Sequence, residues 1–342
     1  MVKKFGNLPT TGETHLYTIY SDPYTATFSD LGATWVSFRM PDRTGKRTDV
    51  ILGYGTAREY YRGDAFLGAV VGRNANRMAG ATFPLGERRV ELTPNEGENN
   101  LHSGPDHWHR RLWTVEHYGE NTITFGLDSP DGDQGFPGAG RVLVKYTLSG
   151  GSLTVSYQGC FDRDTLFNPT QHAYFNLAGH DHPEQAPAQY LTIAASHYTP
   201  LGEGNIPTGE ILPVAGTVLD YTKPRRVGRN LEKEPLLRAQ YGLDHNFVLD
   251  RPGLDVPAAK LVSPYTGCSL QVYTDCPGIQ VYGGNFLRVS GKKQFYYDKN
   301  SGICLETQFF PNSPNVPHWP QCVVKAGQTV VRTTRFVFGV EE

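Results

Sequence analysis

Residues 167–179 read FNPTQHAYFNLAG, and this stretch gives the strongest single indication of the fold. Asn168-Pro169 is a breaker and Gly179 closes the segment, so an extended strand is expected between them. Strand side chains alternate between two faces, which separates an apolar set from a polar set. The apolar set is Ala173, Phe175 and Leu177, and the polar set is His172, Tyr174 and Asn176. Such a polar face fits either a half-buried strand that is simply wet or a surface that binds a hydroxyl-rich ligand.

The rest of the chain also reads as short strands joined by turns. Three hairpins are predicted, over residues 113–127, 141–157 and 323–338, each around a short turn that contains glycine. Helical periodicity is scarce, and the best helical candidate, residues 231–241, is interrupted by Pro235. The 38 Gly and 24 Pro are spread along all 342 residues, which suits many turns. The sequence therefore predicts one all-β domain over residues 1–342, a large sandwich of mainly antiparallel sheets.

Charge and composition exclude several classes of partner. Lys+Arg is 32 and Asp+Glu is 34, so no basic surplus points to nucleic acid or to an anionic membrane. The first residues, MVKKFGNLPT, lack the apolar run of a secretory signal. No run approaches the roughly 18 apolar residues of a membrane span. The five cysteines include no C-x-x-C motif, so a cytoplasmic protein with reduced, mostly buried thiols is expected.

Five further segments combine turn residues with polar side chains that suit ligand binding. They are GRNANR at residues 72–77, NNLHSG at 99–104, YGLDHNF at 241–247, PGIQVY at 277–282 and GICLETQ at 302–308. In the last segment, alternation places Glu306 and Gln308 on one strand face, with Ile303 and Leu305 on the other. Cys304 shares the face of Glu306, so it is expected in the same wall of a cleft.

Together with the opening stretch, these segments resemble the aldose 1-epimerase family, the galactose mutarotases, in order and spacing over essentially the whole chain. The resemblance implies a large twisted antiparallel β-sandwich, the galactose mutarotase-like supersandwich, with its site in an open cleft. It implies an isomerase that interconverts the α and β anomers of free aldohexoses such as galactose and glucose, without a metal or any cofactor. The implied partner is a small-molecule sugar, bound by a monomer or a homodimer.

The resemblance also assigns roles to individual residues. Glu306 matches the catalytic base, His172 the general acid and His102 a second active-site histidine. The matched sugar-binding residues are Asn76, Arg77, Asp244 and Gln280. Tyr174 is added to them because it shares the predicted polar face of His172.

The sequence departs from the family pattern at two positions. Gln171 stands where the family often has Asn, and Asn312 stands where it often has Asp. Neither position is catalytic in the family, so at most the fine shape of the cleft is affected.

The chemistry explains the need for an acid and a base together. Opening a hemiacetal ring removes a proton from the C1 hydroxyl while another proton reaches the ring oxygen. A non-catalytic carbohydrate-binding protein on the same scaffold would use the sugar-binding residues but would not need both Glu306 and His172. An epimerase for a disaccharide or a phosphosugar is the other alternative.

Other conspicuous side chains have ordinary explanations. Exposed positions are expected for Arg73, His180, His182 and the cluster of Arg225, Arg226 and Arg229. The spacing of His102, His107 and His109 matches no zinc signature, so no metal site is predicted there.

Overall fold

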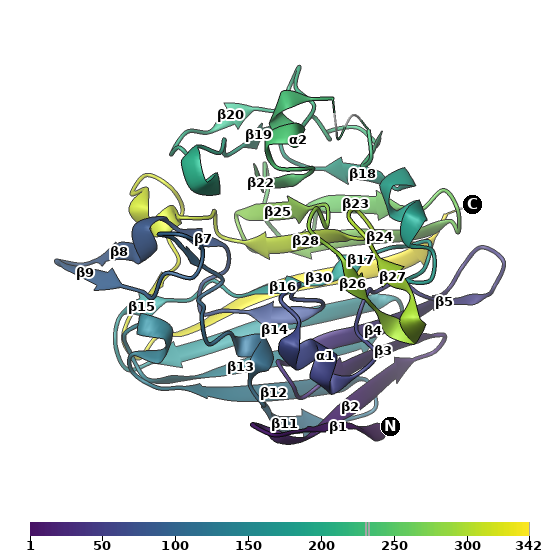
Figure 1. Cartoon of the computed structure of the whole chain (residues 1–342), viewed down its shortest axis with the longest axis horizontal. Coiled ribbons are helices and arrows are strands. Elements are labelled where there is room, and N and C mark those ends of the chain that lie inside the picture. Colours follow the sequence, from purple (N-terminus) through teal and green to yellow (C-terminus); the bar gives the residue numbers. More distant parts are fainter. Residues whose placement is uncertain (230, 232, 342) are drawn as a thin grey trace.

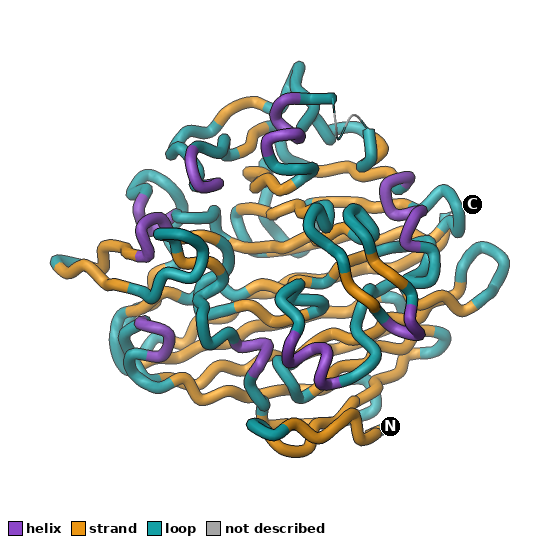
Figure 2. The backbone as a smooth tube through the Cα atoms, viewed as in Figure 1, coloured by secondary structure: helices purple, strands orange, loops and turns teal. Residues whose placement is uncertain are grey.

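The structure, a computed structural model, describes residues 1–229, 231 and 233–341. Strands are its main regular structure, and the helices are short (Figures 1 and 2). Its three largest sheets pair their strands antiparallel throughout, which confirms the predicted all-β class. Within the described ranges, no helix is long and apolar enough to cross a membrane.

The N-terminal residues form a five-stranded sheet whose spatial order follows the chain. Its strands are β1 (Val2–Leu8), β2 (Gly12–Ser21), β3 (Tyr24–Ser29), β4 (Thr34–Pro41) and β5 (Arg47–Asp49).

A nine-stranded sheet forms the broad layer of long strands in Figure 1. In spatial order its strands are β11 (Thr114–Tyr118), β12 (Thr122–Ser129), β13 (Gly140–Ser149), β14 (Ser152–Phe161), β30 (Thr329–Val340), β24 (Cys268–Thr274), β23 (Ala259–Val262), β18 (Tyr190–Ile193) and β21 (Arg225–Arg226). The pairs β11-β12 and β13-β14 are two of the three predicted hairpins.

A six-stranded sheet carries much of the polar chemistry. In spatial order its strands are β17 (Tyr174–Phe175), β28 (Ile303–Gln308), β25 (Gly278–Tyr282), β22 (Asp244–Val248), β19 (His197–Tyr198) and β20 (Leu212–Pro213). Smaller two-stranded ladders join β10 (Asn100–Leu101) to β7 (Arg77–Met78), β16 (Thr170–His172) to β6 (Ala69–Val71), β15 (Thr165–Leu166) to β29 (Val323–Val324), β26 (Val289–Ser290) to β27 (Tyr296–Tyr297) and β8 (Thr82–Leu85) to β9 (Arg88–Glu91).

The third predicted hairpin, over residues 323–338, is wrong. Strand β29 pairs with β15 instead of β30. Both edges of β30 are already occupied, by β14 on one side and β24 on the other. A turn sequence predicts where the chain reverses, but the partners of β29 and β30 are strands distant in the sequence.

The helices are α1 (Ala57–Arg62) and α2 (Pro235–Ala239), with 3-10 turns at Ala79–Ala81, Trp108–Arg110, Asp133–Gly135, Pro183–Ala188, Glu203–Asn205, Lys292–Gln294 and Ser313–Asn315. Residue 232 of the predicted helix lies outside the described residues. Pro235 does not interrupt α2 but begins it, at the position where a missing N–H costs nothing. Helix α1 was not predicted, although Thr56 and Glu59 form a capping box at its start.

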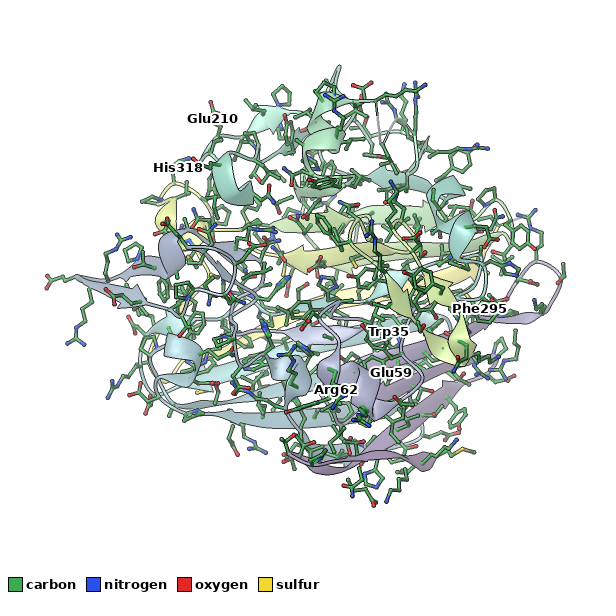
Figure 3. All side chains as sticks on the ribbon, viewed as in Figure 1. Trp35, Glu59, Arg62, Glu210, Phe295 and His318 are labelled. Carbon is green, nitrogen blue, oxygen red and sulfur yellow. The ribbon has the colours of Figure 1, made fainter. Side chains whose placement is uncertain are left out.

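One buried apolar cluster takes residues from all three large sheets. Trp35, labelled in Figure 3, is fully buried in this cluster. The rings of Phe38 and Phe338 stack with centroids 3.8 Å apart, which joins the five-stranded sheet to the nine-stranded sheet. From β28, Ile303 and Leu305 enter the same cluster. The alternate residues of β28 therefore face away from this core, and this sets up the site described next.

The stretch at 167–179 is not one half-buried strand, as expected, but two short strands in different sheets. β16 pairs with β6, whereas β17 pairs with β28, and the chain crosses from one partner to the other at Ala173. Residues 165–180 are all buried, so the wet-face interpretation is wrong. The polar face is also incomplete, because the Asn176 amide donates to the His182 carbonyl rather than lining a cleft.

Candidate active site

Seven of the eight residues predicted to act on a sugar line one cavity of about 560 Å³, called the cleft below. The seven are Asn76, Arg77, His102, His172, Tyr174, Asp244 and Glu306. The eighth, Gln280, lies beside the cleft wall, where its Nε2 donates to Asp244 Oδ1 at 2.7 Å. The structure thus gathers residues from six separate segments of the sequence.

Strands β28, β25 and β22 lie side by side and place the polar groups in rows (Figure 1). In one row Glu306 is opposite Gln280, which is opposite Asn246 on β22. In the next row Cys304 and Asp244 lie on either side of Tyr282. Because opposed residues of antiparallel strands share a face, the alternation that sends Leu305 into the core sends these side chains toward the cleft.

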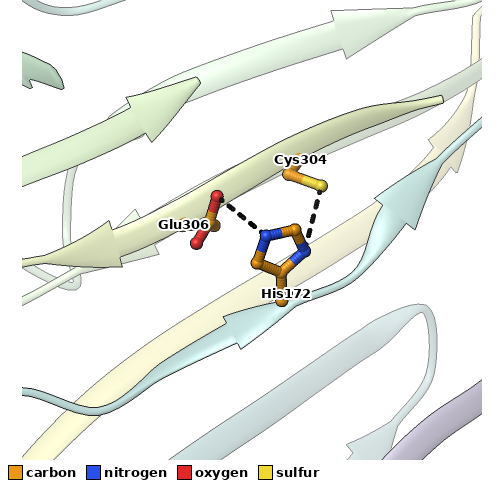
Figure 4. A group of neighbouring side chains, drawn as sticks. All are labelled: His172, Cys304 and Glu306. Atoms are coloured by element: carbon orange, nitrogen blue, oxygen red, sulfur yellow. Dashed lines mark hydrogen bonds and ion pairs between the residues drawn. The ribbon is translucent and has the colours of Figure 1, made fainter. Parts of the chain in front are cut away.

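Glu306 and His172 are neighbours in the cleft (Figure 4). Oε1 of Glu306 lies 3.7 Å from Nε2 of His172, and the other ring nitrogen, Nδ1, lies 3.5 Å from Sγ of Cys304. Glu306 is 2% exposed and His172 is 5% exposed. Oε2 of Glu306 has no hydrogen-bond partner among the described residues, so it is available to a ligand.

Burial moves the pKa values of this pair in opposite directions. Burial raises the pKa of the Glu306 carboxyl well above its usual range, and the Asp244 charge adds to that effect. Burial lowers the pKa of the His172 imidazole to about 4. Both shifts favour uncharged groups, and the state in which both groups are uncharged holds a single exchangeable proton, on Glu306.

His102 is fixed by the backbone of the GRNANR segment. The N–H of Asn76 donates to Nδ1 of His102 at 3.1 Å, so Nδ1 is an acceptor and the ring proton lies on Nε2. Burial keeps the pKa of His102 well below its usual value. Both residues are in the left-handed region, with φ of 64° at Asn76 and 53° at His102, a conformation that is uncommon for histidine. The ring centroids of His102 and His172 are 5.6 Å apart.

Arg77 is held in a chain of charged contacts along the cleft wall. Its Nε and Nη2 donate to the two carboxylate oxygens of Glu96 at 2.7 and 2.8 Å, a bidentate pair. Its Nη1 lies 3.9 Å from Asp244 Oδ2. Burial raises the pKa of the Asp244 carboxyl, while Arg77 and the amide of Gln280 act against that rise. Asp244 therefore has a positive neighbour and an amide donor beside its carboxylate.

Aromatic rings close the walls of the cleft. The Tyr174 hydroxyl donates to the Ala65 carbonyl at 2.8 Å, so the residue presents its ring to the cleft. Phe66, which has a φ of 52°, contacts the rings of His102 and His172 at centroid distances of 4.9 and 5.7 Å. Tyr282 lies 6.1 Å from the His172 ring, centroid to centroid.

Several cleft residues were not predicted from the sequence. Those missed include Glu96, Phe66 and three exposed residues at the mouth, Arg62, Phe286 and Arg288. Glu96 had a partial signal, because it stands with Glu98 in the Gly- and Asn-rich stretch PNEGENN, where either carboxylate could pair with an arginine. Phe66, Phe286 and Arg288 lie in loops without a motif, and Arg62 is the last residue of α1, which was not predicted.

Two predicted surface residues are buried in the structure. Arg73 is fully buried, which contradicts the expected surface position, and it donates to Ser129 Oγ and to the carbonyls of Pro130 and Pro137. It ties together loops that would otherwise leave carbonyls unpaired. His180 is also buried, with its Nδ1 3.1 Å from the Tyr297 hydroxyl, so its predicted exposure is wrong.

The two departures from the family pattern lie outside the cleft lining. Gln171 accepts a hydrogen bond from the Tyr146 hydroxyl at 2.7 Å and donates to the Gly68 carbonyl at 2.6 Å. Asn312 Oδ1 accepts from the backbone N–H of Ala79 at 3.0 Å. Both amides therefore have structural partners.

One group of side chains could offer ligands to a metal. Within the described ranges, His172, Cys304 and Glu306 have ligand atoms that all lie within 4.8 Å of one another. They could supply one nitrogen, one sulfur and one oxygen. The metal-free reaction implied by the sequence resemblance therefore stays a prediction.

Comparisons with known proteins match nearly the whole chain. The family model described as "Aldose 1-epimerase" matches residues 15–337. A galactose mutarotase from Sus scrofa is 41% identical over 339 residues, covering 98% of this chain and 97% of its own. An aldose 1-epimerase from Escherichia coli K12 is 35% identical over 322 residues, covering 92% of each.

Among solved structures, an aldose epimerase homologue from C. elegans superposes with a TM-score of 0.89 at 28% identity, covering 96% of this chain and all of the other. A galactose 1-epimerase from Lactobacillus acidophilus NCFM gives a TM-score of 0.87 at 25% identity, covering 100% of this chain and 99% of the other.

Proposed function

Since the chain belongs to the aldose 1-epimerase family, we propose that it is a mutarotase, an isomerase that interconverts the α and β anomers of free aldohexoses such as galactose and glucose. The observation that carries the proposal is the contact between Glu306 and His172 in the cleft, 3.7 Å from carboxylate oxygen to ring nitrogen. The hydroxyl oxygen and the ring oxygen of a sugar are both bonded to C1. An acid and a base can reach these two atoms together only if they are close neighbours.

The reaction follows from that placement. Glu306 takes the proton from the C1 hydroxyl while His172 gives a proton from Nε2 to the ring oxygen, and the C1 to ring-oxygen bond breaks. Rotation about the C1–C2 bond then presents the other face of the aldehyde. In the reverse direction the C5 hydroxyl attacks C1, His172 takes that hydroxyl proton, and Glu306 returns its proton to the oxygen on C1. Every proton is returned, so the cycle needs no cofactor or co-reactant.

The proton count of the pair supports this assignment. The buried pair holds one exchangeable proton near neutral pH, and one base and one acid are what ring opening requires. The pKa of the Glu306 carboxyl is raised, so its carboxylate is a stronger base than that of an ordinary glutamate. The His172 imidazolium has a lowered pKa, which makes it a stronger acid than an ordinary histidine. Arg77 favours the charged form of Glu306, and sugar hydroxyls replace part of the lost hydration.

The remaining residues hold the sugar in this proposal. His102 presents its Nε2–H as a donor toward the ring-oxygen end. Asn76, Arg77, Asp244 and Gln280 bind hydroxyl groups, either directly or through each other. The ring of Tyr174 forms part of the wall against which the apolar face of a sugar packs.

The proposal also covers organisation and location. Residues 1–342 are taken as one domain, supported by the buried cluster shared among the three large sheets. The protein is taken as cytoplasmic, because its five cysteines are free. It is taken as a monomer or a homodimer, as the family resemblance implies.

Polarimetry of freshly dissolved α-galactose and α-glucose, each with and without protein, tests the activity. Faster approach to the equilibrium rotation is expected, with the Glu306→Gln variant giving only the spontaneous rate. Sugar binding by calorimetry without any acceleration would instead indicate a carbohydrate-binding protein on this scaffold.

A further inference from the structure

The two ring nitrogens of His172 have different neighbours, and one of these neighbours has no part in the reaction described above. We propose that Cys304 is a positioning residue for the acid, whose sulfur accepts a hydrogen bond from Nδ1–H of His172 and so leaves Nε2 as the nitrogen that gives and takes the proton. The inference rests on the proposed roles of His172 and Glu306.

The geometry places the sulfur where an orienting group is needed. Sγ of Cys304 lies 3.5 Å from Nδ1 of His172, within the range of hydrogen bonds to sulfur, while Nε2 points toward Glu306 (Figure 4). Cys304 is fully buried, and it lies two residues before Glu306 on β28, so one strand carries both the sulfur and the base. Tyr174 of β17 pairs with Cys304 directly, which fixes the segment that follows His172 against the same strand.

The reaction cycle decides the direction of this hydrogen bond. When Nε2 has given its proton to the ring oxygen, the proton that remains on the imidazole must be on Nδ1. The alternative is an imidazolate, which is far too basic to form under these conditions. A buried N–H needs an acceptor, and Sγ of Cys304 is the side-chain atom at hydrogen-bonding distance in the described part of the chain.

An uncharged sulfur suits this position better than the carboxylate that orients histidine in many hydrolases. Burial raises the pKa of the Cys304 thiol well above its usual value, and the Glu306 charge adds to the effect, so the sulfur stays protonated and neutral. A neutral, weak acceptor orients the ring without stabilising the imidazolium, so His172 remains a strong acid. A carboxylate here would hold the proton on His172 and would repel Glu306.

The test uses full-length protein labelled with ¹⁵N-histidine, together with kinetics by polarimetry. In the wild type, the His172 signals are expected to show a protonated Nδ1 and an unprotonated Nε2 near neutral pH. The Cys304→Ala variant should shift the Nδ1 signal toward an unprotonated nitrogen, since the two tautomers then mix. Its kcat for galactose should fall severalfold to about tenfold, the effect of one ordinary hydrogen bond, with KM within about twofold. The Cys304→Ser variant keeps an acceptor, so it should restore most of the Nδ1 signal and most of kcat.

Cys276→Ala is the matched control, because Cys276 is also buried but its sulfur has Asp275 as its partner, not His172. It should leave the His172 signals and kcat unchanged. An unprotonated Nδ1 in the wild type would overturn the inference even if the alanine variant did not fold. Unchanged signals and kcat in Cys304→Ala would also overturn it. A wild-type protein without mutarotase activity would instead refute the proposed function, so the two failures are distinguishable.

Discussion

Asp244 Oδ1 accepts a hydrogen bond from Gln280 Nε2 at 2.7 Å, across the neighbouring strands β22 and β25. Gln280 in turn lies opposite Glu306 on β28. The proposed sugar-binding carboxylate is thus hydrogen-bonded to an amide that lies opposite the proposed base in a continuous sheet. The positions of these groups depend on strand register, so substitutions in this row should alter chemistry more than stability.

Glu306→Gln is the most direct test of the base. The amide preserves the shape of the side chain but cannot accept the C1 hydroxyl proton, so mutarotation of α-galactose should fall by at least about 10². The control is Glu210→Gln, the same change at an exposed residue away from the cleft (Figure 3). Turnover close to that of the wild type in Glu306→Gln would remove Glu306 from the role of base.

The two histidines should differ in the kinetic constant that they control. His172→Asn is expected to lower kcat more than His102→Asn does, because the proposed mechanism has His172 exchange protons and His102 hold the ring-oxygen end of the sugar. Loss of His102 should raise KM as well, because it removes a donor to the bound sugar. Michaelis–Menten analysis of both variants by polarimetry measures the order. A reversed order in kcat would exchange the two roles.

The pH dependence of kcat/KM should show a broad plateau across neutrality. Activity requires the pair of His172 and Glu306 to hold one exchangeable proton. As the pH falls through about 4, the lowered pKa of His172, the pair gains a second proton and Glu306 can no longer act as a base. As the pH rises through the elevated pKa of Glu306, the pair loses its proton and no acid remains. The spontaneous rate must be subtracted at each pH, and an acid limb centred near ~6.5, the value of an unperturbed histidine, would contradict the prediction.

Removal of metal ions should leave activity unchanged. The cluster of His172, Cys304 and Glu306 has the ligand types for a metal, but the proposed proton transfers use two of these residues directly. The measurement is mutarotation after prolonged dialysis against a chelator, then after addition of zinc. Inhibition by added zinc would agree with the prediction, because the ion would occupy the acid and the base. Activity lost on chelation and restored by zinc would show that the reaction depends on a metal.

Neutral aldohexoses should be preferred over sugar phosphates. Asp244 lies in the cleft and disfavours a dianion, and Arg77 is already held by Glu96. The mouth nevertheless carries the exposed arginines Arg62 and Arg288, which the sequence analysis did not place there. Galactose should show the highest kcat/KM, followed by glucose and then glucose 6-phosphate. If the phosphate ester were the best substrate, and the Arg62→Ala and Arg288→Ala variants lost that advantage, the two arginines would be its anchor.

The sequence was informative wherever a short-range rule controls the structure. Alternation along residues 302–308 placed Glu306 and Cys304 on one face and Leu305 on the other, as β28 has them. The turns around residues 119–121 and 149–151 gave two hairpins with their correct partners.

The predictions failed where distant parts of the chain decide the outcome. Nothing local shows that β30 already has two partners, or that the chain changes sheets at Ala173. Arg73 reads as a surface charge, because the carbonyls that receive its guanidinium come from loops more than fifty positions later. Phe66 contacts two cleft histidines through a backbone conformation that no residue preference indicates.

The change of sheet at Ala173 has a consequence for how this protein loses activity. His172 belongs to the ladder with β6, whereas Glu306 belongs to the six-stranded sheet, so the reactive pair spans a seam between two separately paired units. A displacement of about 1 Å across that seam is enough to impair proton transfer, although every strand could remain intact. Activity should therefore be lost before circular dichroism detects any loss of strands. In a urea titration, inactivation would precede the loss of β signal, and bound galactose, by bridging the seam, would bring the two transitions together.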